Sequence, residues 1–473
     1  MAAFFCPYKD NIFLRKNALK STLQAEKELK KIKNYLTENL NPENLEKIAR
    51  DTGFIARSSK IDAFKFLTCL LFNEQSQKDT SLLNLKADFL KHYDCDITRV
   101  ALHKRFNTSA VEFMKTILSE HIAQRFDPGN DLKAKFNSIR IKDSSKFSIP
   151  KSLSTDYPGY NGFHPGLALM NIQYEFDLLS GDWKYFELTK ATRNDQHDSK
   201  TTLDNINSGD LSLRDLGYIT MSYLKGVIAR QAYFVNRLPT SLNVYYADKE
   251  ELEEFGWKKI HNQMTRGKLS QLELNVLLGK KEQLPVRLII VPVPDDVYQK
   301  RIKNASKHAK SKGVQLSDDY KIKSRYNLFI TNATPQQIST NEVANIYGLR
   351  WQIELIFKTW KSNLKIHMTK KVKKERFECQ LIAKIIWVVI NWRLFQIANH
   401  ILKKRREGRG CSVHKFYKEA QKFSVYIKDF VILKKPIDRW FHDKFYPLIG
   451  ELVIEQKKGK TTHCQIVSES LIL

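Results

Sequence analysis

One stretch of the chain must fold as a helix with two chemically different faces. An α-helix turns about 100° per residue, so residues offset by 3, 7 and 14 positions return to nearly the same side. This spacing places Tyr347, Arg350, Glu354 and Lys361 within roughly 60° of one another, with Lys358 on the same stripe. Another face is apolar, as packing against a core requires: Ile346, Leu349, Ile353, Ile356, Trp360 and Leu364. A lone carboxylate flanked by cations is typical of a site that holds a metal ion beside phosphate.

The start of this helix is also encoded. Ser339-Thr-Asn-Glu342 fits a capping box and Pro335 lies just upstream, so the helix is predicted to begin near residue 340. The alternative is an ordinary surface helix whose charged side is solvated and whose Glu354 and Lys358 form an i, i+4 pair. The rest of the chain has to decide between these two interpretations.

The chain carries a large excess of positive charge. Its 473 residues include 79 Lys and Arg against 51 Asp and Glu, a formal net charge of +28. Such an excess repels itself, and a polyanionic partner relieves the repulsion. Nucleic acid is the first candidate, because neutralising phosphates releases counterions and gives affinity for any sequence. An anionic membrane surface is a weaker candidate, since we recognise no basic amphipathic terminal anchor.

Composition indicates a folded intracellular protein. Hydrophobic residues make up 42% and aromatic residues 11% of the chain, which predicts a sizeable core and allows two to four domains. Six cysteines stand apart, without a CxxC motif or a recognisable secretory segment, so reduced thiols are expected. The most apolar stretch, residues 381–402, is interrupted by Lys384, Asn391 and Arg393. It predicts a buried helix rather than a membrane span.

Residues 1–135 are predicted to be helical and basic. Within them, residues 96–107 begin with a helix cap and follow another helical segment at about 80–92. The short helix carries Arg99, His103, Lys104 and Arg105. This arrangement is typical of the helix that reads DNA in a helix-turn-helix. The alternative is a basic, solvated helix in a bundle.

From residue 136 the pattern changes to strands. The expected strands are 138–143, 167–177, 183–189, a short strand ending at Asp215, and 232–237. The expected helices between them are 201–208 and 220–230. Ser180-Gly181-Asp182 is a hairpin turn between the second and third strands. The order β-β-β-α-β-α-β is that of an RNase H-like domain that still lacks one helix.

The missing helix follows a long β-rich insertion. Residues 239–332 contain strand-like pieces and a charged, helix-prone segment at 295–312. Residues 333–405 return to the core with the two-faced helix, and residues 406–473 form a basic C-terminal region that is a candidate for dimerisation. The predicted fold class is α/β: an RNase H-like core that begins with residues 136–238, a β-rich insertion, and helical N- and C-terminal regions.

Two further carboxylates lie where predicted strands end. Asp143 ends the first strand and Asp215 the fourth; these strands are neighbours in such a sheet, so both side chains face the crevice beyond the strand ends. With Glu354 they offer hard oxygen ligands for two Mg²⁺ ions, or Mn²⁺ in their place. One ion activates a water or 3′-hydroxyl and the other stabilises the leaving oxygen. A strand-end Asp is also common as a turn or cap residue. Other acids compete for these places: Asp156 and Asp177 for the first, Asp204 and Asp210 for the second.

Three motifs resemble the insertion-sequence-four family of bacterial DDE transposases. They are Tyr-x2-Arg-x3-Glu-x6-Lys at 347–361, Asp143-Ser-Ser after a strand, and Arg214-Asp-Leu-Gly-Tyr218. The family's YREK signature is matched at all four positions, and the likeness extends over most of the chain. It implies a cytoplasmic, nucleoid-associated enzyme that binds double-stranded DNA at transposon ends and at the target. Relatives nick the end, form and reopen a hairpin, join the end to target DNA, and synapse two ends as a homodimer.

The resemblance also implies roles for individual residues. The metal ligands and catalytic residues are Asp143, Asp215 and Glu354, and the phosphate-gripping residues are Tyr347, Arg350 and Lys361. Arg237, at the end of the fifth strand, matches a DNA-contacting arginine. Tyr326 is the nearest candidate for an aromatic that stacks on a flipped base, one residue from the aligned position. Two alternatives stay open: a nuclease without strand transfer, and a non-catalytic DNA-binding derivative.

Overall fold

The structure is a computed structural model in which the described residues form two compact units. The described residues are 25–57, 59–76, 81–123, 135–160, 166–240, 242–368, 371–405, 410–455 and 461–471. The helical unit falls within Met1–Asn130, Ser148–Thr155 and Leu355–Lys460. The sheet unit falls within Asp131–Phe147, Asp156–Glu354 and Thr461–Leu473.

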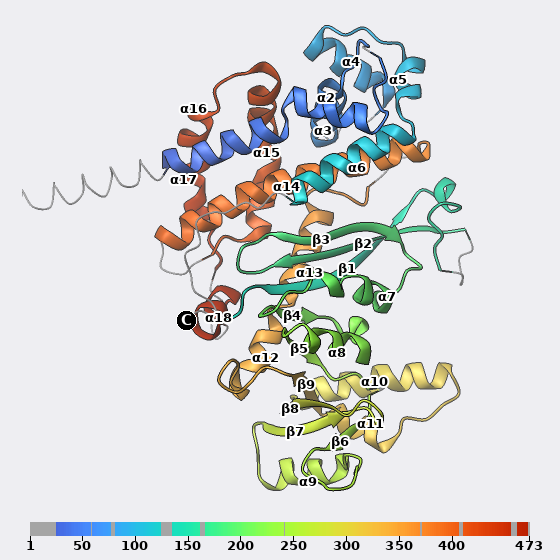
Figure 1. Ribbon diagram of the computed structural model, residues 1–473, viewed down its shortest axis with the longest axis vertical. Helices are drawn as coiled ribbons and strands as arrows, with labels where there is room; N and C mark the ends of the chain where they lie inside the picture. The colour runs from blue at the N-terminus through green and yellow to red at the C-terminus, as the bar shows by residue number, and fades with distance from the viewer. Residues whose placement is uncertain are drawn as a thin grey trace, which may run out of the picture. The chain divides into compact units, whose positions relative to one another are not determined.

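The sheet unit is an α/β structure whose described strands form one nine-stranded mixed sheet (Figure 1). The strands are β1 (Ile139–Ile149), β2 (Ala168–Asp177), β3 (Trp183–Lys190), β4 (Leu211–Arg214), β5 (Tyr233–Arg237), β6 (Val244–Tyr246), β7 (Leu272–Leu278), β8 (Leu284–Pro292) and β9 (Tyr326–Thr331). Their order across the sheet is β3-β2-β1-β4-β5-β9-β8-β7-β6. Strands β1, β4 and β5 are parallel, which places their carboxyl ends at one edge.

Two helices alternate with the first five strands. They are α7 (Asp195–Thr201) and α8 (Met221–Ala229), so the predicted order β-β-β-α-β-α-β is confirmed. The predicted position of the first helix, 201–208, is wrong. The side chain of Asn194 accepts a hydrogen bond from the backbone N–H of His197 and caps the helix, so it begins six residues earlier than the composition indicated.

Residues 239–332 extend this sheet rather than forming a separate β domain. Strand β9 pairs antiparallel with β5, in the register Val235↔Thr331 to Arg237↔Phe329, and β8 then pairs with β9. One buried apolar cluster runs through α8, β5, β8 and β9. The helices of this segment are α9 (Trp257–Arg266), α10 (Asp295–Ser311) and α11 (Asp318–Lys323). The predicted β-rich insertion thus joins the sheet of the core, because β5 offers an open edge whose backbone groups β9 satisfies.

The predicted single helix from residue 340 is two helices, α12 (Thr340–Gly348) and α13 (Trp351–Ser362). Its start is confirmed, because a capping box forms at Ser339. At the junction the backbone N–H of Arg350 bonds to the carbonyl three residues back, at 3.1 Å, rather than four. The tighter turn follows Gly348, a poor helix former, and it separates the two helices.

The helical unit contains one long helix that is apolar on all sides, α14 (Lys374–Arg405). It packs against α3 (Ala63–Ser76) and α6 (Thr108–Ala123). Within the described residues it alone is long and apolar enough to cross a membrane, and 94% of its most apolar window is buried inside the protein. Such a helix belongs to a core. The predicted second part of the RNase H-like core, 333–405, is therefore divided after Glu354, and its remainder joins the helical unit.

The other helices of this unit come from both ends of the described chain. They are residues 25–39, α2 (Pro42–Asp51), α4 (Leu82–Tyr93), α5 (Arg99–Arg105), α15 (Val413–Leu433), α16 (Asp438–Trp440) and α17 (Tyr446–Leu448). The last helix, α18 (His463–Ser470), belongs to the sheet unit and contacts α12.

Candidate active site

The pairing of β1 with β4 brings two of the predicted acids together. The parallel register ends with Lys142 opposite Arg214, so Asp143 and Asp215 are the next residues on two neighbouring strands. The predicted end of β1 at Asp143 is wrong, since the strand continues to Ile149. What stops at residue 142 is the pairing with β4, and this frees Asp143 to face the crevice beyond the shorter strand.

One guanidinium contacts all three predicted catalytic acids. Arg350 donates from Nη1 to Oδ2 of Asp143 at 3.2 Å and from Nη2 to Oε1 of Glu354 at 2.7 Å. Its Nε lies 3.8 Å from Oδ1 of Asp215. The three carboxylates, 72 and 139 positions apart in the sequence, thus surround a single planar group, and their predicted convergence is confirmed.

The acids differ in their access to solvent. The side chains of Asp215 and Glu354 are 47% and 39% exposed, whereas those of Asp143 and Arg350 are 17% and 8% exposed. Burial raises the pKa of Asp143 to about 7, against the lowering effects of the Ser144 backbone N–H and the Arg350 charge. Burial acts to lower the pKa of Arg350, but its acidic neighbours outweigh burial and raise it. The site is therefore open on the side of Asp215 and Glu354.

Two further predicted residues lie next to this cluster. The ring of Tyr347 is largely buried and packs against Phe329 with a centroid distance of 5.5 Å, and the Arg350 guanidinium lies 5.9 Å from the ring of Tyr347. Burial raises the pKa of Tyr347, while the charges of Arg350 and Arg237 act to lower it. Arg237 ends β5 and is half-buried, so it adds a second positive charge near the site.

Tyr326 does not occupy a position suited to stacking on a base. It is 5% exposed, belongs to the apolar cluster of the sheet unit, and its hydroxyl bonds to Nδ1 of His261 at 2.7 Å. A ring that is almost fully buried in a core offers no free face to a nucleotide. This prediction is corrected: Tyr326 is a structural residue at the start of β9.

The remaining predicted DNA contacts lie in the helical unit. Lys358 is exposed on α13, and Lys361 on the same helix is half-buried, with burial lowering its pKa. On α5, Arg99 and Lys104 are exposed. Arg105 is turned inward: it bonds to the hydroxyl of Ser59 and lies 5.9 Å from the ring of Phe54. Arg105 therefore anchors α5, while Arg99 and Lys104 remain available to a partner.

Three of the four competing acids, Asp177, Asp204 and Asp210, have structural partners instead. Asp177 accepts hydrogen bonds from the backbone of Ile139 and Leu179 and from the Ser180 hydroxyl, at 2.8 to 3.1 Å. Asp204 pairs with Arg230, and Asp210 accepts from the backbone N–H of Asn207 and lies 3.4 Å from Arg140. These contacts stabilise turns and the first residues of strands, which is a common role of aspartate at such positions.

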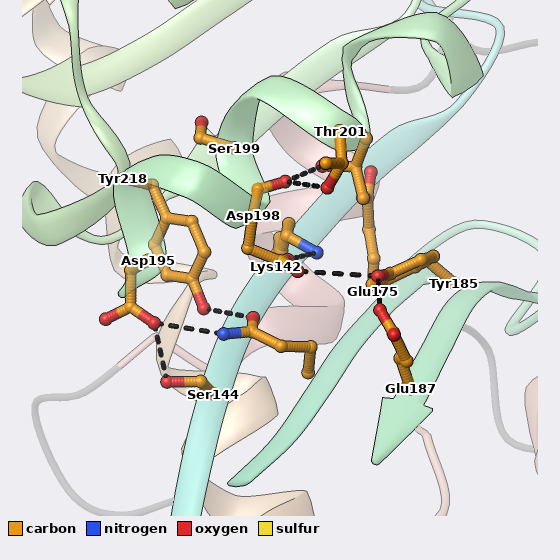
Figure 2. A network of polar contacts seen from close by, with 12 residues as sticks. Lys142, Ser144, Glu175, Tyr185, Glu187, Asp195, Asp198, Ser199, Thr201 and Tyr218 are labelled. Atoms are coloured by element: carbon orange, nitrogen blue, oxygen red, sulfur yellow. Dashed lines mark hydrogen bonds and ion pairs between the residues drawn. The ribbon is translucent and has the colours of Figure 1, made fainter. Parts of the chain in front are cut away.

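Sequence reasoning missed a buried layer of charge beneath the site. Lys142 Nζ lies 2.6 Å from Asp198, and Glu175 lies 2.6 Å from Arg140 and 3.6 Å from Arg214, all of them almost fully buried (Figure 2 includes Lys142, Asp198 and Glu175). Burial lowers the pKa of Lys142 to about 8. For Glu175 burial acts to raise the pKa, but the three cations outweigh it and lower the pKa to about 2. The sequence did contain a signal for this layer, because charged residues stand inside strands that were predicted to lie in the core.

The donor set suits a hard divalent cation. Carboxylate oxygens are the ligands that such ions prefer, and the Arg350 guanidinium shows that a cation is accommodated among the three carboxylates. Within the described parts of the chain no group of three His, Cys, Asp or Glu side chains is arranged to hold a metal ion. The Arg350 guanidinium already contacts one carboxylate oxygen of each acid, so a metal ion would compete with Arg350 for these oxygens.

Comparison with known proteins shows the family. The chain matches the family "Transposase DDE domain" over residues 134–390. It is 30% identical over 403 residues to the transposase for insertion sequence element IS231F of Bacillus thuringiensis subsp. israelensis, covering 81% of this chain and 84% of that protein. The transposase for insertion sequence element IS1151 of Clostridium perfringens is 29% identical over 382 residues, covering 77% and 80%. A cryo-EM structure of a piggyBac transposase synaptic complex with hairpin DNA gives a TM-score of 0.43 at 11% identity, covering 93% of this chain and 89% of that one.

The family match and the curated relatives establish that the chain belongs to the DDE transposases of bacterial insertion sequences. It is a DNA transposase, an enzyme that cleaves DNA and transfers strands.

Proposed function

We propose that Asp143, Asp215 and Glu354 form the catalytic centre of this transposase, on an RNase H-like core, and hold Mg²⁺. The observation that carries the proposal is the meeting of all three carboxylates around the Arg350 guanidinium, within 3.8 Å of its nitrogens. Besides this arginine, the cluster of negative charge is contacted by the Ser144 backbone N–H, which donates to Asp143, and two of its acids face solvent.

Bound divalent ions would supply charge stabilisation for phosphoryl transfer and lower the pKa of an attacking water or 3′-hydroxyl. The chain's own part is to bring three carboxylates to one point and to hold a guanidinium beside them. When the carboxylates take a metal ion, Arg350 loses partners that keep it in place and can donate to a DNA phosphate instead, for which its planar fork is suited. Arg350 thus serves both the acids and the substrate.

Around this centre we assign the DNA contacts by charge and exposure. Tyr347 and Arg237 line the site in the sheet unit, and Lys358 and Lys361 continue the same helix, α13, that carries Glu354. Arg99 and Lys104 on α5 present exposed cations for binding the transposon end. The partner is double-stranded DNA, both the transposon ends and the target, and the enzyme acts as a homodimer that brings two ends together.

The variant Glu354→Gln tests the catalytic assignment. It keeps the size of the side chain and removes the charge that a metal ion requires, so end cleavage in Mg²⁺ should fall by at least about 100-fold. Binding of a transposon-end duplex should change little, because the basic surface remains. The measurement is gel-based cleavage of a labelled end, with binding followed by fluorescence anisotropy in EDTA.

The matched control is Glu251→Gln, the same change at an exposed glutamate of the sheet unit. It should cleave as the wild type does. Wild-type cleavage by Glu354→Gln, or equal losses in the two variants, would remove Glu354 from the catalytic centre.

A further inference from the structure

Four polar side chains connect the segments that carry Asp143 and Asp215. Ser144 Oγ donates to Asp195 Oδ1 at 3.0 Å, and Gln173 Nε2 donates to the same oxygen at 3.1 Å. The Tyr218 hydroxyl donates to Gln173 Oε1 at 2.7 Å. We call Ser144, Asp195, Gln173 and Tyr218 the polar bridge; Figure 2 shows its contacts, with Ser144, Asp195 and Tyr218 labelled.

Each end of the polar bridge is tied to one of the acids. Ser144 follows Asp143 in β1, and its backbone N–H donates to Asp143 Oδ1 at 2.8 Å. Tyr218 closes the 3₁₀ turn that follows β4, where its backbone N–H donates to the carbonyl of Asp215 at 3.0 Å. A hydrogen-bonded path therefore runs from one acid, through β2 and the start of α7, to the other.

The middle of the polar bridge is sealed from solvent. Gln173 and Tyr218 are both 0% exposed, so water does not replace a lost partner. Burial raises the pKa of the Tyr218 hydroxyl, which stays protonated and can donate to Gln173. Asp195 is fixed from its own side, because it is the first residue of α7 behind the capping Asn194. The bridge consequently has a defined length.

We propose that the polar bridge sets the separation of Asp143 and Asp215 and thereby the affinity of the site for a divalent cation. The proposal rests on the assignment of these two acids as metal ligands. Their strands pair only as far as Lys142 and Arg214, so backbone hydrogen bonds between β1 and β4 end one residue before the acids. Ser144, Asp195, Gln173 and Tyr218 supply the restraint there and act as positioning residues.

The first test compares two tyrosine hydroxyls in the same core. Tyr218→Phe removes the donor to Gln173 and should weaken Mn²⁺ binding to the full-length protein by about 10- to 100-fold, the loss typical when a group that orients a metal ligand is removed. Tyr223→Phe removes a hydroxyl that is equally buried but bonds to Ser212 at 2.6 Å, outside the bridge. It should leave Mn²⁺ affinity within about twofold of the wild type. Both are titrated with MnCl2 without DNA, following free Mn²⁺ by electron paramagnetic resonance.

A second pair separates geometry from charge. Asp195→Asn keeps an oxygen that accepts from Ser144 and Gln173, so it should bind Mn²⁺ nearly as the wild type does. Asp195→Ala removes the acceptor and should lose affinity as Tyr218→Phe does. If Asp195→Asn and Asp195→Ala lose equal affinity, the residue acts through its charge and the bridge is not the restraint.

The outcomes distinguish this proposal from the catalytic assignment on which it rests. If Glu354→Gln and the wild type bind Mn²⁺ equally, the metal site itself is misassigned. If Glu354→Gln loses Mn²⁺ while Tyr218→Phe retains it, or if Tyr223→Phe loses as much as Tyr218→Phe, the polar bridge does not position the acids. Loss of Mn²⁺ affinity in Glu354→Gln, Tyr218→Phe and Asp195→Ala, with wild-type affinity in Tyr223→Phe and Asp195→Asn, supports the proposal.

Discussion

At the scale of single residues, the structure is governed by where charge is buried and what neutralises it. Arg350 is the clearest case, since one side chain that is 8% exposed compensates three carboxylates. A lysine would not replace it, because an ammonium is a point charge without the fork that reaches several oxygens at once. Some buried ionisable groups elsewhere are held neutral instead, and they make stability depend on pH.

His121, on α6 of the helical unit, is such a group. It is 1% exposed, its Nδ1 bonds to the Tyr35 hydroxyl at 2.9 Å, and burial, with the charge of Arg393, lowers its pKa to about 3 from 6.5. The unfolded chain takes up a proton below about pH 6.5 while the folded protein does not. His121 therefore makes the unfolding free energy fall by about 1.4 kcal/mol per pH unit between pH 6.5 and 3.

Urea unfolding at pH 7, 6 and 5 measures this effect. His121→Gln should show a shallower decline of unfolding free energy below pH 6.5 than the wild type, whereas the exposed His103→Gln should match the wild type. Parallel curves for His121→Gln and the wild type would show that His121 is not the group responsible.

At the scale of elements, the helix that carries Glu354 depends on how the sheet ends. Glu354 lies on α13, which follows α12 and the loop after β9. Arg287 of β8 holds that loop: it donates to the carbonyls of Ala333 and Ile338 at 2.8 and 2.9 Å. It also forms a two-point pair with Glu273 of β7, at 2.7 and 2.8 Å. The strands added by residues 239–332 thus fix the start of α12.

Arg287→Ala should lower the unfolding free energy of the protein by about 2–4 kcal/mol, because it leaves two buried carbonyls and a carboxylate without their donor. Thr340→Val, which removes a single hydroxyl bond to the same Glu273, should cost about 1 kcal/mol. Denaturant unfolding of the two variants measures the difference. Equal effects would mean that the loop is held by packing and not by Arg287.

At the scale of the whole molecule, the dominant property is charge. The chain carries a formal net charge of +28, and this charge matches the polyanionic substrate of a transposase. Most of these cations are exposed and act through long-range attraction, which salt screens. Cations that contact phosphates directly would in addition release counterions.

The affinity for a transposon-end duplex should therefore fall by about a thousandfold between roughly 50 and 200 mM NaCl, the change expected for several phosphate contacts. A plot of log Kd against log salt concentration measures it, and a scrambled duplex of equal length should give a similar slope. A slope for the end duplex close to zero would show that binding is not driven by phosphate contacts.

The sequence by itself determined the class of protein, the order of strands and helices in the sheet unit, and three candidate acids that the fold brings together, because hydrophobic period, turn residues and motif spacing are local properties. It also placed Tyr347 and Arg350 beside Glu354. The predictions failed at the α12–α13 junction and at the start of α7, where the deciding signals, Gly348 and the capping Asn194, are themselves local. They also failed at the end of β1, where the strand continues past its pairing with β4.

Only the tertiary structure decided which groups compensate the acids and which aromatic is buried. Arg350 meets Asp143 and Asp215 because β1 and β4 pair in one particular register, and Tyr326 lies in the core because β9 completes the sheet beside β5. Strand pairing joins residues that are far apart in the chain. The partners that stabilise it cannot be identified from a local sequence pattern. The polar bridge belongs to the same class of contact, for the same physical reason.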